Sequence, residues 1–274
     1  MKKYRFIVLP ILALFVLAAT PLWADISPVG ERVGTCLGDN DVYKVHADGI
    51  DIGYCLIGSG KPLLMLTGLG CTMDDWPEEI VEKLSARYQL VLMDNRGMGF
   101  SSEDGTDFSY PLFARDVLAL MDELGLSKTY VLGYSQSSVT TQQLLLSAPE
   151  RFEKAIIHAT SVDGSSVADS LSKKSEKMSE SLSPVVKRQL EAAKTWKSPL
   201  DRLSNLSMPV MFLVGTDDTV VGADSSLKLV SVVPGSWLIR FKGGTHRLMY
   251  EAPKDFASVV TQFLELNEIV ELPE

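Results

Sequence analysis

A short segment in the middle of the chain reads Gly133-Tyr134-Ser135-Gln136-Ser137. A strand-like run, residues 130–133, leads into it, and a helical pattern, residues 137–147, begins at its end. So tight a turn tolerates only small side chains two positions before and two positions after its central residue, and Gly133 and Ser137 are both small. Such a turn would present the Ser135 hydroxyl as a nucleophile. The segment alone also fits a plain turn, so its meaning depends on the rest of the chain.

Strand-like and helix-like segments alternate along most of the chain. Strands are expected at residues 42–46, 50–56, 62–66, 89–93, 130–133, 154–158, 209–215 and 237–241, and helices at 75–86, 110–124, 137–147 and 253–266. The first two strands flank Asp48-Gly49, a hairpin signal. The later alternation predicts a parallel sheet with helices on both faces. We therefore expect an α/β protein with a mostly parallel, eight-stranded sheet that is mixed only at its amino-terminal edge.

Residues 162–197 interrupt this alternation with helical composition and no strand signal. Apolar positions such as Leu171, Leu182 and Leu190 favour packing onto the body of the protein. We interpret the stretch as a small helical cap insertion within one domain, residues 25–274. A flexible surface linker is the alternative.

The histidines narrow the search for a base, which a serine hydroxyl needs at neutral pH. Where the nucleophile lies on a strand–turn–helix elbow, an acid and then a histidine follow it in the chain. Of three histidines only His246 comes late, directly after the last expected strand. We interpret His46, on an edge strand, as a surface side chain. His158, at the end of a strand, is interpreted as a pocket or core imidazole.

The acid is expected after the strand at 209–215, where the chain reads Gly215-Thr216-Asp217-Asp218. This segment resembles the acid loop of the α/β-hydrolase family, in which the acid stands three residues after the glycine. The resemblance selects Asp218 and leaves Asp217 as a minor alternative. Together with the motifs described next, it covers the chain from about residue 42 to residue 266 and implies the α/β-hydrolase fold.

Two further loops resemble the same family. The segment Thr67-Gly68-Leu69-Gly70 is similar to its His-Gly-x-Gly loop, with Thr67 in place of the histidine. The resemblance implies an oxyanion hole made by the backbone N–H groups of Leu69 and Gln136. Residues 94–101 are similar to the family's Asp-x-Arg-Gly-x-Gly-x-Ser loop, in which we expect Arg96 to tie loops together. Ser137 departs from the family's second elbow glycine.

The resemblance also implies a chemistry. A triad of Ser135, His246 and Asp218 would cleave an ester or related acyl bond of a small molecule through an acyl-enzyme, with no cofactor. Perhydrolysis, carbon–carbon bond hydrolysis and aminopeptidase chemistry use the same triad and remain alternatives. A non-catalytic binding protein of the same fold is an alternative of another class. No pair of cysteines has metal-ligand spacing, so no metal site is expected.

The amino terminus has the layout of a secretory signal peptide. Three positive residues among the first five precede 14 uncharged residues, 6–19, and Ala24 ends a possible cleavage site. The apolar run is short for a membrane span of ~20 residues, so we expect residues 1–24 to be cleaved and the protein to be exported, periplasmic or extracellular. An uncleaved anchor is the alternative. Cleavage takes the net charge from −9 to −12, and an acidic chain argues against a nucleic-acid partner.

Export would place Cys36, Cys55 and Cys71 in an oxidising compartment. Pairing through the hairpin turn puts Val42 opposite Cys55, so a bridge between Cys36 and Cys55 requires residues 37–41 to fold back. This bridge, with Cys71 free, is the pairing we expect first. A bridge from Cys36 to Cys71 and three free thiols are the alternatives.

Overall fold

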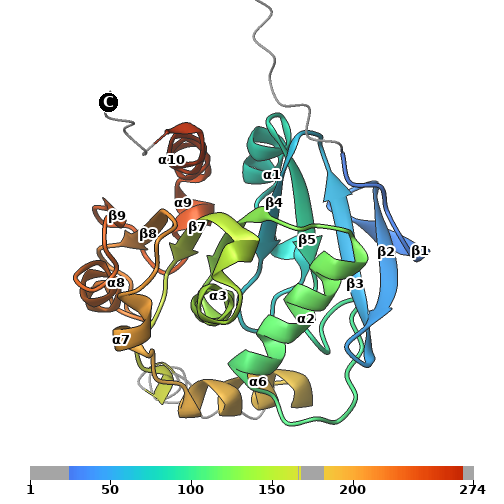
Figure 1. The fold of residues 1–274 in the computed structure, drawn as a ribbon, viewed down its shortest axis with the longest axis horizontal. Coiled ribbons are helices and arrows are strands. Elements are labelled where there is room, and N and C mark those ends of the chain that lie inside the picture. The colour runs from blue at the N-terminus through green and yellow to red at the C-terminus, as the bar shows by residue number, and fades with distance from the viewer. Residues whose placement is uncertain (1–24, 166, 168–181, 268–274) are drawn as a thin grey trace, which may run out of the picture.

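The computed structural model describes residues 25–165, 167 and 182–267. The expected signal peptide, residues 1–24, lies outside them, as do residues 168–181 of the expected insertion. One nine-stranded sheet runs through the described part in the order β1-β2-β3-β5-β4-β6-β7-β8-β9 (Figure 1). Strands β5, β4, β6, β7, β8 and β9 pair in parallel, and β1, β2 and β3 join them by antiparallel pairing at the amino-terminal edge.

The strands are β1 (Glu31–Cys36), β2 (Asn40–Ala47), β3 (Ile50–Ile57), β4 (Lys61–Leu66), β5 (Tyr88–Met93), β6 (Thr129–Tyr134), β7 (Phe152–His158), β8 (Val210–Gly215) and β9 (Trp237–Phe241). The α-helices are α1 (Glu78–Ser85), α2 (Tyr110–Glu123), α3 (Gln136–Ser147), α6 (Pro184–Thr195), α7 (Leu200–Leu203), α8 (Ala223–Val230), α9 (Leu248–Glu251) and α10 (Pro253–Glu265), with short 3-10 turns at Met73–Asp75 and Pro149–Arg151. Among the described residues, none of these helices is long and apolar enough to cross a membrane.

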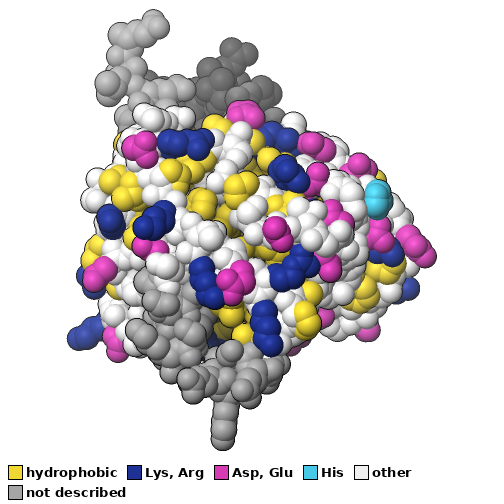
Figure 2. Space-filling model, turned by 90° about the horizontal axis from the view of Figure 1, so that it is seen from below, with side chains coloured by type: hydrophobic (Ala, Val, Ile, Leu, Met, Phe, Trp, Pro, Cys, Tyr) yellow, Lys and Arg dark blue, Asp and Glu magenta, His cyan; other side chains and the backbone are white. Residues whose placement is uncertain are grey.

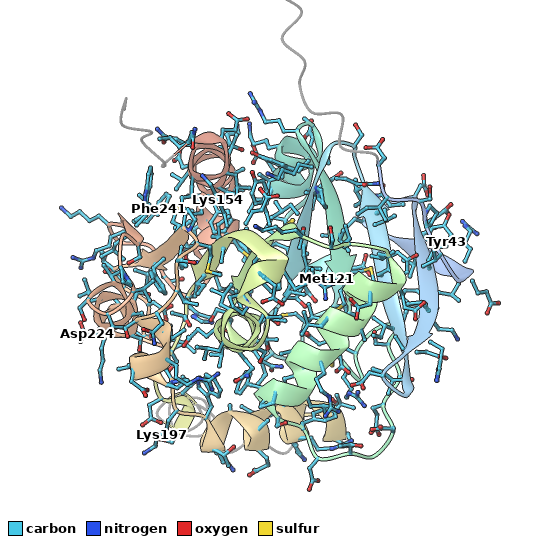
Figure 3. The ribbon with its side chains drawn as sticks, in the orientation of Figure 1. Tyr43, Met121, Lys154, Lys197, Asp224 and Phe241 are labelled. Carbon is cyan, nitrogen blue, oxygen red and sulfur yellow. The ribbon has the colours of Figure 1, made fainter. Side chains whose placement is uncertain are left out.

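Alternate side chains of the central strands build two separate cores. In β4, Leu63 and Met65 enter the core that α1 and α10 cover, whereas Leu64 and Leu66 enter the core that α2, α3 and α8 cover (Figure 1). Met121 of α2, labelled in Figure 3, belongs to the second core. Because both faces are covered, the central strands are buried along their length and their sequences are nearly continuous apolar runs.

The sheet has nine strands and not the eight that the sequence predicts, because β1 lies beyond the expected hairpin. This edge strand buries only Cys36, and a strand that is solvated on both faces shows no apolar alternation to find. Leu37 and Gly38, both at positive φ, turn the chain back so that Cys36 lies opposite Asn40. The next register, Val42 opposite Cys55, is as the sequence predicts.

The two ends of the expected insertion, residues 162–197, lie side by side. Asp163 and Lys197 form an isolated antiparallel bridge, and the Gly164 N–H donates to the Trp196 carbonyl at 3.0 Å (Lys197 is labelled in Figure 3). Helix α6 lies at the bottom of Figure 1. Figure 2 views the molecule from that side, where charged side chains of both signs are scattered among apolar ones.

Candidate active site

Ser135 occupies the strained turn between β6 and α3. Its φ of 53° and ψ of −114° are rare for a residue with a side chain, and such conformations persist where the surroundings enforce them. The Ser135 N–H donates to the His158 carbonyl at 3.0 Å, which fixes the turn to β7. A Cβ atom on Gly133 would stand 2.2 Å from Thr141 Oγ1 and 2.3 Å from the Ser137 carbonyl oxygen. Only glycine therefore fits at position 133.

Three side chains from three separate segments meet at the carboxyl ends of the parallel strands. Ser135 Oγ lies 2.8 Å from Nε2 of His246, in the loop after β9, and His246 Nδ1 lies 2.8 Å from Oδ2 of Asp218, after β8. The carboxylate beside Nδ1 favours the tautomer with its proton on that nitrogen, which leaves Nε2 free to accept the Ser135 proton. The arrangement therefore joins a hydroxyl, a base and a carboxylate in one relay.

Asp218 is built to stay ionised although its side chain is wholly buried. Its second oxygen, Oδ1, accepts from the backbone N–H groups of Val220 at 2.9 Å and Val221 at 3.1 Å. Burial opposes ionisation, but His246 and these two N–H groups outweigh it, so the pKa of Asp218 lies below its ordinary value. The neighbouring Asp217 is exposed and accepts only from the Thr216 hydroxyl among the described residues. The structure thus brings Asp218, and not Asp217, to His246.

The two expected oxyanion donors flank Ser135. Leu69 lies in a turn closed by the Cys71 N–H, which donates to the Gly68 carbonyl at 3.3 Å, and Gln136 begins α3. Within the described part of the chain, neither the Leu69 N–H nor the Gln136 N–H has a hydrogen-bond partner. Both residues line the same cavity as Ser135. Two unpaired backbone donors beside a hydroxyl suit an oxygen that becomes negative during reaction.

Two departures from the family pattern meet beneath the elbow. Thr67 and Ser137 stand where the family has a histidine and a glycine, and both contact Asn95. The Asn95 amide nitrogen lies 3.4 Å from Ser137 Oγ and 3.3 Å from the Thr67 carbonyl oxygen. One buried hydrogen-bond cluster therefore accommodates both substitutions, and it supports the turn that carries Leu69.

The 94–101 loop has the structural role that the sequence predicts. Arg96 is buried and makes a two-pronged ion pair with Asp116 of α2, at 2.9 and 2.5 Å, and a further contact with Asp104 at 2.9 Å. The Asp94 carboxylate accepts from the N–H groups of Met73 and Phe100, each at 2.8 Å. Neither charged side chain lines the cavity at Ser135.

The cavity in front of Ser135 has a volume of about 190 Å³. No Asp, Glu, Lys or Arg side chain lines it among residues 25–165, 167 and 182–267. It is lined by Gly68, Leu69, Cys71, Tyr110, Tyr134, Ser135, Gln136, Val139, Ser161, Gly164, Val167, Leu190, Ala193, Val220, Val221 and His246. Burial raises the pKa of the Cys71 thiol to about 11, so this cysteine stays protonated near neutral pH and does not compete as a nucleophile.

The His46 side chain is exposed beside Asp51, as the sequence predicts, but its strand β2 pairs with β1 and β3 and is not the edge of the sheet. The prediction of an edge strand was wrong because β1 has no apolar alternation that would reveal it. His158 is fully buried at the end of β7, where Nδ1 lies 3.0 Å from the Leu213 carbonyl oxygen and the ring stacks on Tyr134, with centroids 5.2 Å apart. Burial lowers the pKa of His158 to about 4. The described residues contain no group of three or more His, Cys, Asp or Glu side chains that could hold a metal ion.

Sequence reasoning missed two residues that support the site. The Tyr134 hydroxyl donates to the His246 carbonyl oxygen at 3.2 Å, and the Gln189 side-chain oxygen accepts from the Gly70 N–H at 2.9 Å. Tyr134 stands inside the quoted elbow, so its place beside Ser135 was a usable signal. Gln189 is 119 residues from Gly70 and carries no local signal.

Comparison with known proteins shows the family of the chain. A sequence profile described as the alpha/beta hydrolase fold matches residues 61–198, half of the chain. The chain belongs to the alpha/beta hydrolase fold family. The mouse protein named serine hydrolase BPHL is 26% identical over 258 residues, which cover 81% of this chain and 86% of that protein. The pimeloyl-[acyl-carrier protein] methyl ester esterase of Aeromonas salmonicida is 33% identical over 105 residues, or 38% of this chain and 39% of that one.

Solved structures of this fold superpose on most of the chain. MGS-M2, an alpha/beta hydrolase enzyme from a deep-sea metagenome library of the Medee basin, matches with a TM-score of 0.73 at 17% identity and covers 83% of this chain and 99% of its own. At that identity the likeness supports the fold alone. The first curated relatives that the chain matches align over about two fifths of their own length. Their alignments therefore leave the activity of the whole protein to be argued from the site.

Proposed function

We propose that this alpha/beta hydrolase is a serine hydrolase that cleaves an ester or related acyl bond of a small molecule through an acyl-enzyme. The observation that carries the proposal is the relay of two 2.8 Å contacts, from Ser135 Oγ to His246 and from His246 to Asp218. The relay opens into a cavity beside two unpaired backbone N–H groups. A nucleophile, a base, an orienting carboxylate and donors for a developing negative charge are the parts that acyl transfer requires.

The reaction follows from the contacts. His246 Nε2 removes the Ser135 proton while Ser135 Oγ attacks the substrate carbonyl carbon, and the Leu69 and Gln136 N–H groups receive the carbonyl oxygen as it becomes negative. His246 then gives its proton to the departing alcohol, which leaves the acyl group on Ser135. Water then enters, and His246 removes its proton while the water oxygen attacks the acyl carbon. The bond between that carbon and Ser135 Oγ breaks, His246 returns the proton to Ser135 Oγ, and the acid is released. Asp218 stabilises the imidazolium form in both halves.

The volume and lining of the cavity limit which acyl groups can bind. An apolar cavity of ~150 Å³ holds a benzene molecule, so about 190 Å³ suits an acyl chain of similar or slightly larger size. The absence of charged side chains among the described lining residues favours an uncharged acyl group, because a buried charge needs a partner. We propose short, uncharged acyl esters as the substrate class.

A series of nitrophenyl esters with acetyl, butyryl, hexanoyl and dodecanoyl groups tests the proposal. We expect kcat/KM to be highest for the short acyl groups and to fall for dodecanoyl, with no activity in Ser135→Ala. An ester series that the wild-type protein leaves intact, with no covalent adduct at Ser135, would instead favour a binding protein of this fold. Three further assays test the alternative reactions. Peracid formation from an ester and hydrogen peroxide would show perhydrolysis, and cleavage of a vinylogous diketone would show carbon–carbon bond hydrolysis. Cleavage of an amino-acid arylamide would show aminopeptidase activity.

We also propose export. The charged start and the 14 uncharged residues before Ala24 support it. Amino-terminal sequencing of the protein from its native cells should find a mature chain that begins near Asp25. An intact Met1 in the membrane fraction would show an anchor instead.

A further inference from the structure

The turn that carries Leu69 has a backbone group that the turn itself cannot satisfy. Its closing hydrogen bond joins Cys71 to Gly68, and Gly70, the third residue, has a φ of 71°. A positive φ at the third position is the signature of a type II turn. Compared with a type I turn, the central peptide between Leu69 and Gly70 is rotated by about half a turn. In either turn type the Gly70 N–H takes no part in the closing bond and needs an outside partner, and the rotation decides on which face of the turn that partner must lie.

That partner comes from helix α6. The Gly70 N–H donates to Gln189 Oε1 at 2.9 Å, and Gln189 is wholly buried. Rotating the central peptide towards a type I turn would break this bond and leave a buried acceptor unpaired, which costs free energy. Gln189 Nε2 has no partner among the described residues, so the amide serves this contact through its oxygen. The bond thus selects one orientation of the peptide next to the Leu69 N–H.

Helix α6 is packed closely enough to act as a fixed support. A Cβ atom on Gly70 would stand 3.3 Å from Val186 Cγ2, so the helix lies directly on the turn. Arg188 pairs with Glu103 at 2.7 Å, and its guanidinium lies 4.0 Å from the centre of the Phe108 ring. Val186 and Gln189, three residues apart, contact the turn. Arg188, on another face of the helix, ties α6 to Glu103 and Phe108 of the body.

We propose that Gln189 is a positioning residue, whose side-chain oxygen holds the oxyanion turn in the orientation that aligns the Leu69 donor. The inference rests on the proposed function, because it assigns the oxyanion role to the Leu69 N–H. Gln189 does not touch the reacting atoms and acts through Gly70. Its loss should therefore weaken stabilisation of the transition state and leave binding of the neutral substrate in the cavity unchanged.

Gln189→Met and Gln189→Glu separate the hydrogen bond from the packing. Methionine fills a similar volume without an amide oxygen, whereas glutamate keeps an acceptor oxygen in either protonation state. Removing an oxyanion donor outright costs ~10²–10³ in kcat, so misaligning one in Gln189→Met should lower kcat by roughly 10-fold with KM within about twofold. Gln189→Glu should recover most of the loss. Gln189→Asn, which keeps the amide but is one methylene shorter, should behave like Gln189→Met.

Arg188→Met is the matched control, because it removes a contact between α6 and the body on another face of the helix and does not touch the turn. It should change kcat by less than about twofold. The affinity for an aryl boronic acid, which forms a tetrahedral adduct with the serine, should fall in Gln189→Met by the same factor as kcat. Affinity for the acid product should not change.

The inference is wrong if Gln189→Met and Gln189→Asn keep the wild-type kcat and boronate affinity, or if Arg188→Met lowers both as much as they do. The first result would make the bond to Gly70 a structural contact alone, and the second would make general loosening of α6 the cause. Either result leaves the proposed function standing, since wild-type turnover and its dependence on Ser135 are measured separately. An inactive wild-type protein would remove both.

Discussion

The Ser135, Asp218 and His246 side chains are held by the sheet and by the loops at its carboxyl edge, whereas the Leu69 turn is held in part by α6. Ser135 is fixed to β7 through the His158 carbonyl, and Asp218 is fixed by two N–H groups of its own loop. The turn with Leu69 depends on Gln189, a residue of the 162–197 stretch. Variation in that stretch can therefore change the oxyanion half of the site while the relay keeps its geometry. The first two predictions below act on the triad, the third on His158 beneath it, and the last on the amino-terminal edge of the sheet.

The largest effect is expected at the relay itself. Ser135→Ala removes the attacking atom, and losses of ~10⁶ in kcat follow when a triad nucleophile is removed. Ester hydrolysis by the purified variant measures this. Activity within about tenfold of wild type would place the nucleophile elsewhere and make the 2.8 Å contact with His246 incidental.

The next largest effect separates two neighbouring carboxylates. Asp218→Asn should lower kcat by ~10⁴, because an amide beside His246 Nδ1 favours the wrong tautomer. Asp217→Asn is the matched control and should cost less than about twofold, since Asp217 is exposed and does not contact His246. Equal losses of kcat in the two variants would contradict the assignment of Asp218 as the carboxylate that orients His246.

His158, which lies beneath the triad, should make the free energy of unfolding depend on pH. Burial lowers the pKa of His158 to about 4, against ~6.5 for an unperturbed histidine. The unfolded chain therefore binds the extra proton as the pH falls below about 6.5, whereas the folded chain binds it only near 4. The contribution of His158 to the free energy of unfolding is therefore at its maximum above pH ~6.5. About 3 kcal/mol of it is lost as the pH falls through 4.

His158→Asn tests this dependence, because asparagine keeps an N–H for the Leu213 carbonyl and does not titrate. We expect a lower stability at neutral pH and a flatter profile between pH 6.5 and 4 in urea unfolding. An unchanged slope would assign the acid sensitivity to other groups. Since the sheet holds the relay, the variant should retain turnover at neutral pH where it is folded.

The smallest effect concerns the amino-terminal edge, which is remote from both halves of the site. Cys36 and Cys55 are buried free thiols in one core cluster, and the hydrogen bond with Cys55 together with burial raises the pKa of the Cys36 thiol. Refolding with glutathione disulfide as oxidant should join these two and leave Cys71 free. A loop of about 20 residues would add up to ~3 kcal/mol of stability. Peptide mapping without reduction that finds Cys71 in the bridge, or three alkylatable thiols, would contradict this, and kcat should not change.

The sequence was informative where a function needs a local pattern. The elbow requires a glycine at 133 and a serine at 135 within one turn, and the acid loop requires a fixed spacing from Gly215, so both were visible as short motifs. The hairpin register was visible for the same reason, because Asp48-Gly49 fixes which residues face each other across β2 and β3. These features depend on residues close together in the chain.

The features that sequence reasoning missed depend on contacts between distant segments. Nothing near Gln189 marks it as the partner of Gly70, and Thr67, Asn95 and Ser137 become a cluster only when β4, β5 and β6 lie side by side. Strand β1 is solvated and has no apolar period, so its sequence predicts no strand. The sequence therefore predicts which three side chains meet, and it does not predict the contacts that support them.

The central claim is that Ser135 forms the covalent intermediate. The direct measurement is to react the purified protein with a fluorophosphonate, digest it and locate the added mass by tandem mass spectrometry. The account predicts a single adduct on Ser135, absent from Ser135→Ala and slowed by His246→Ala. An adduct on Ser137 or Ser138, or labelling that persists in Ser135→Ala, would contradict it.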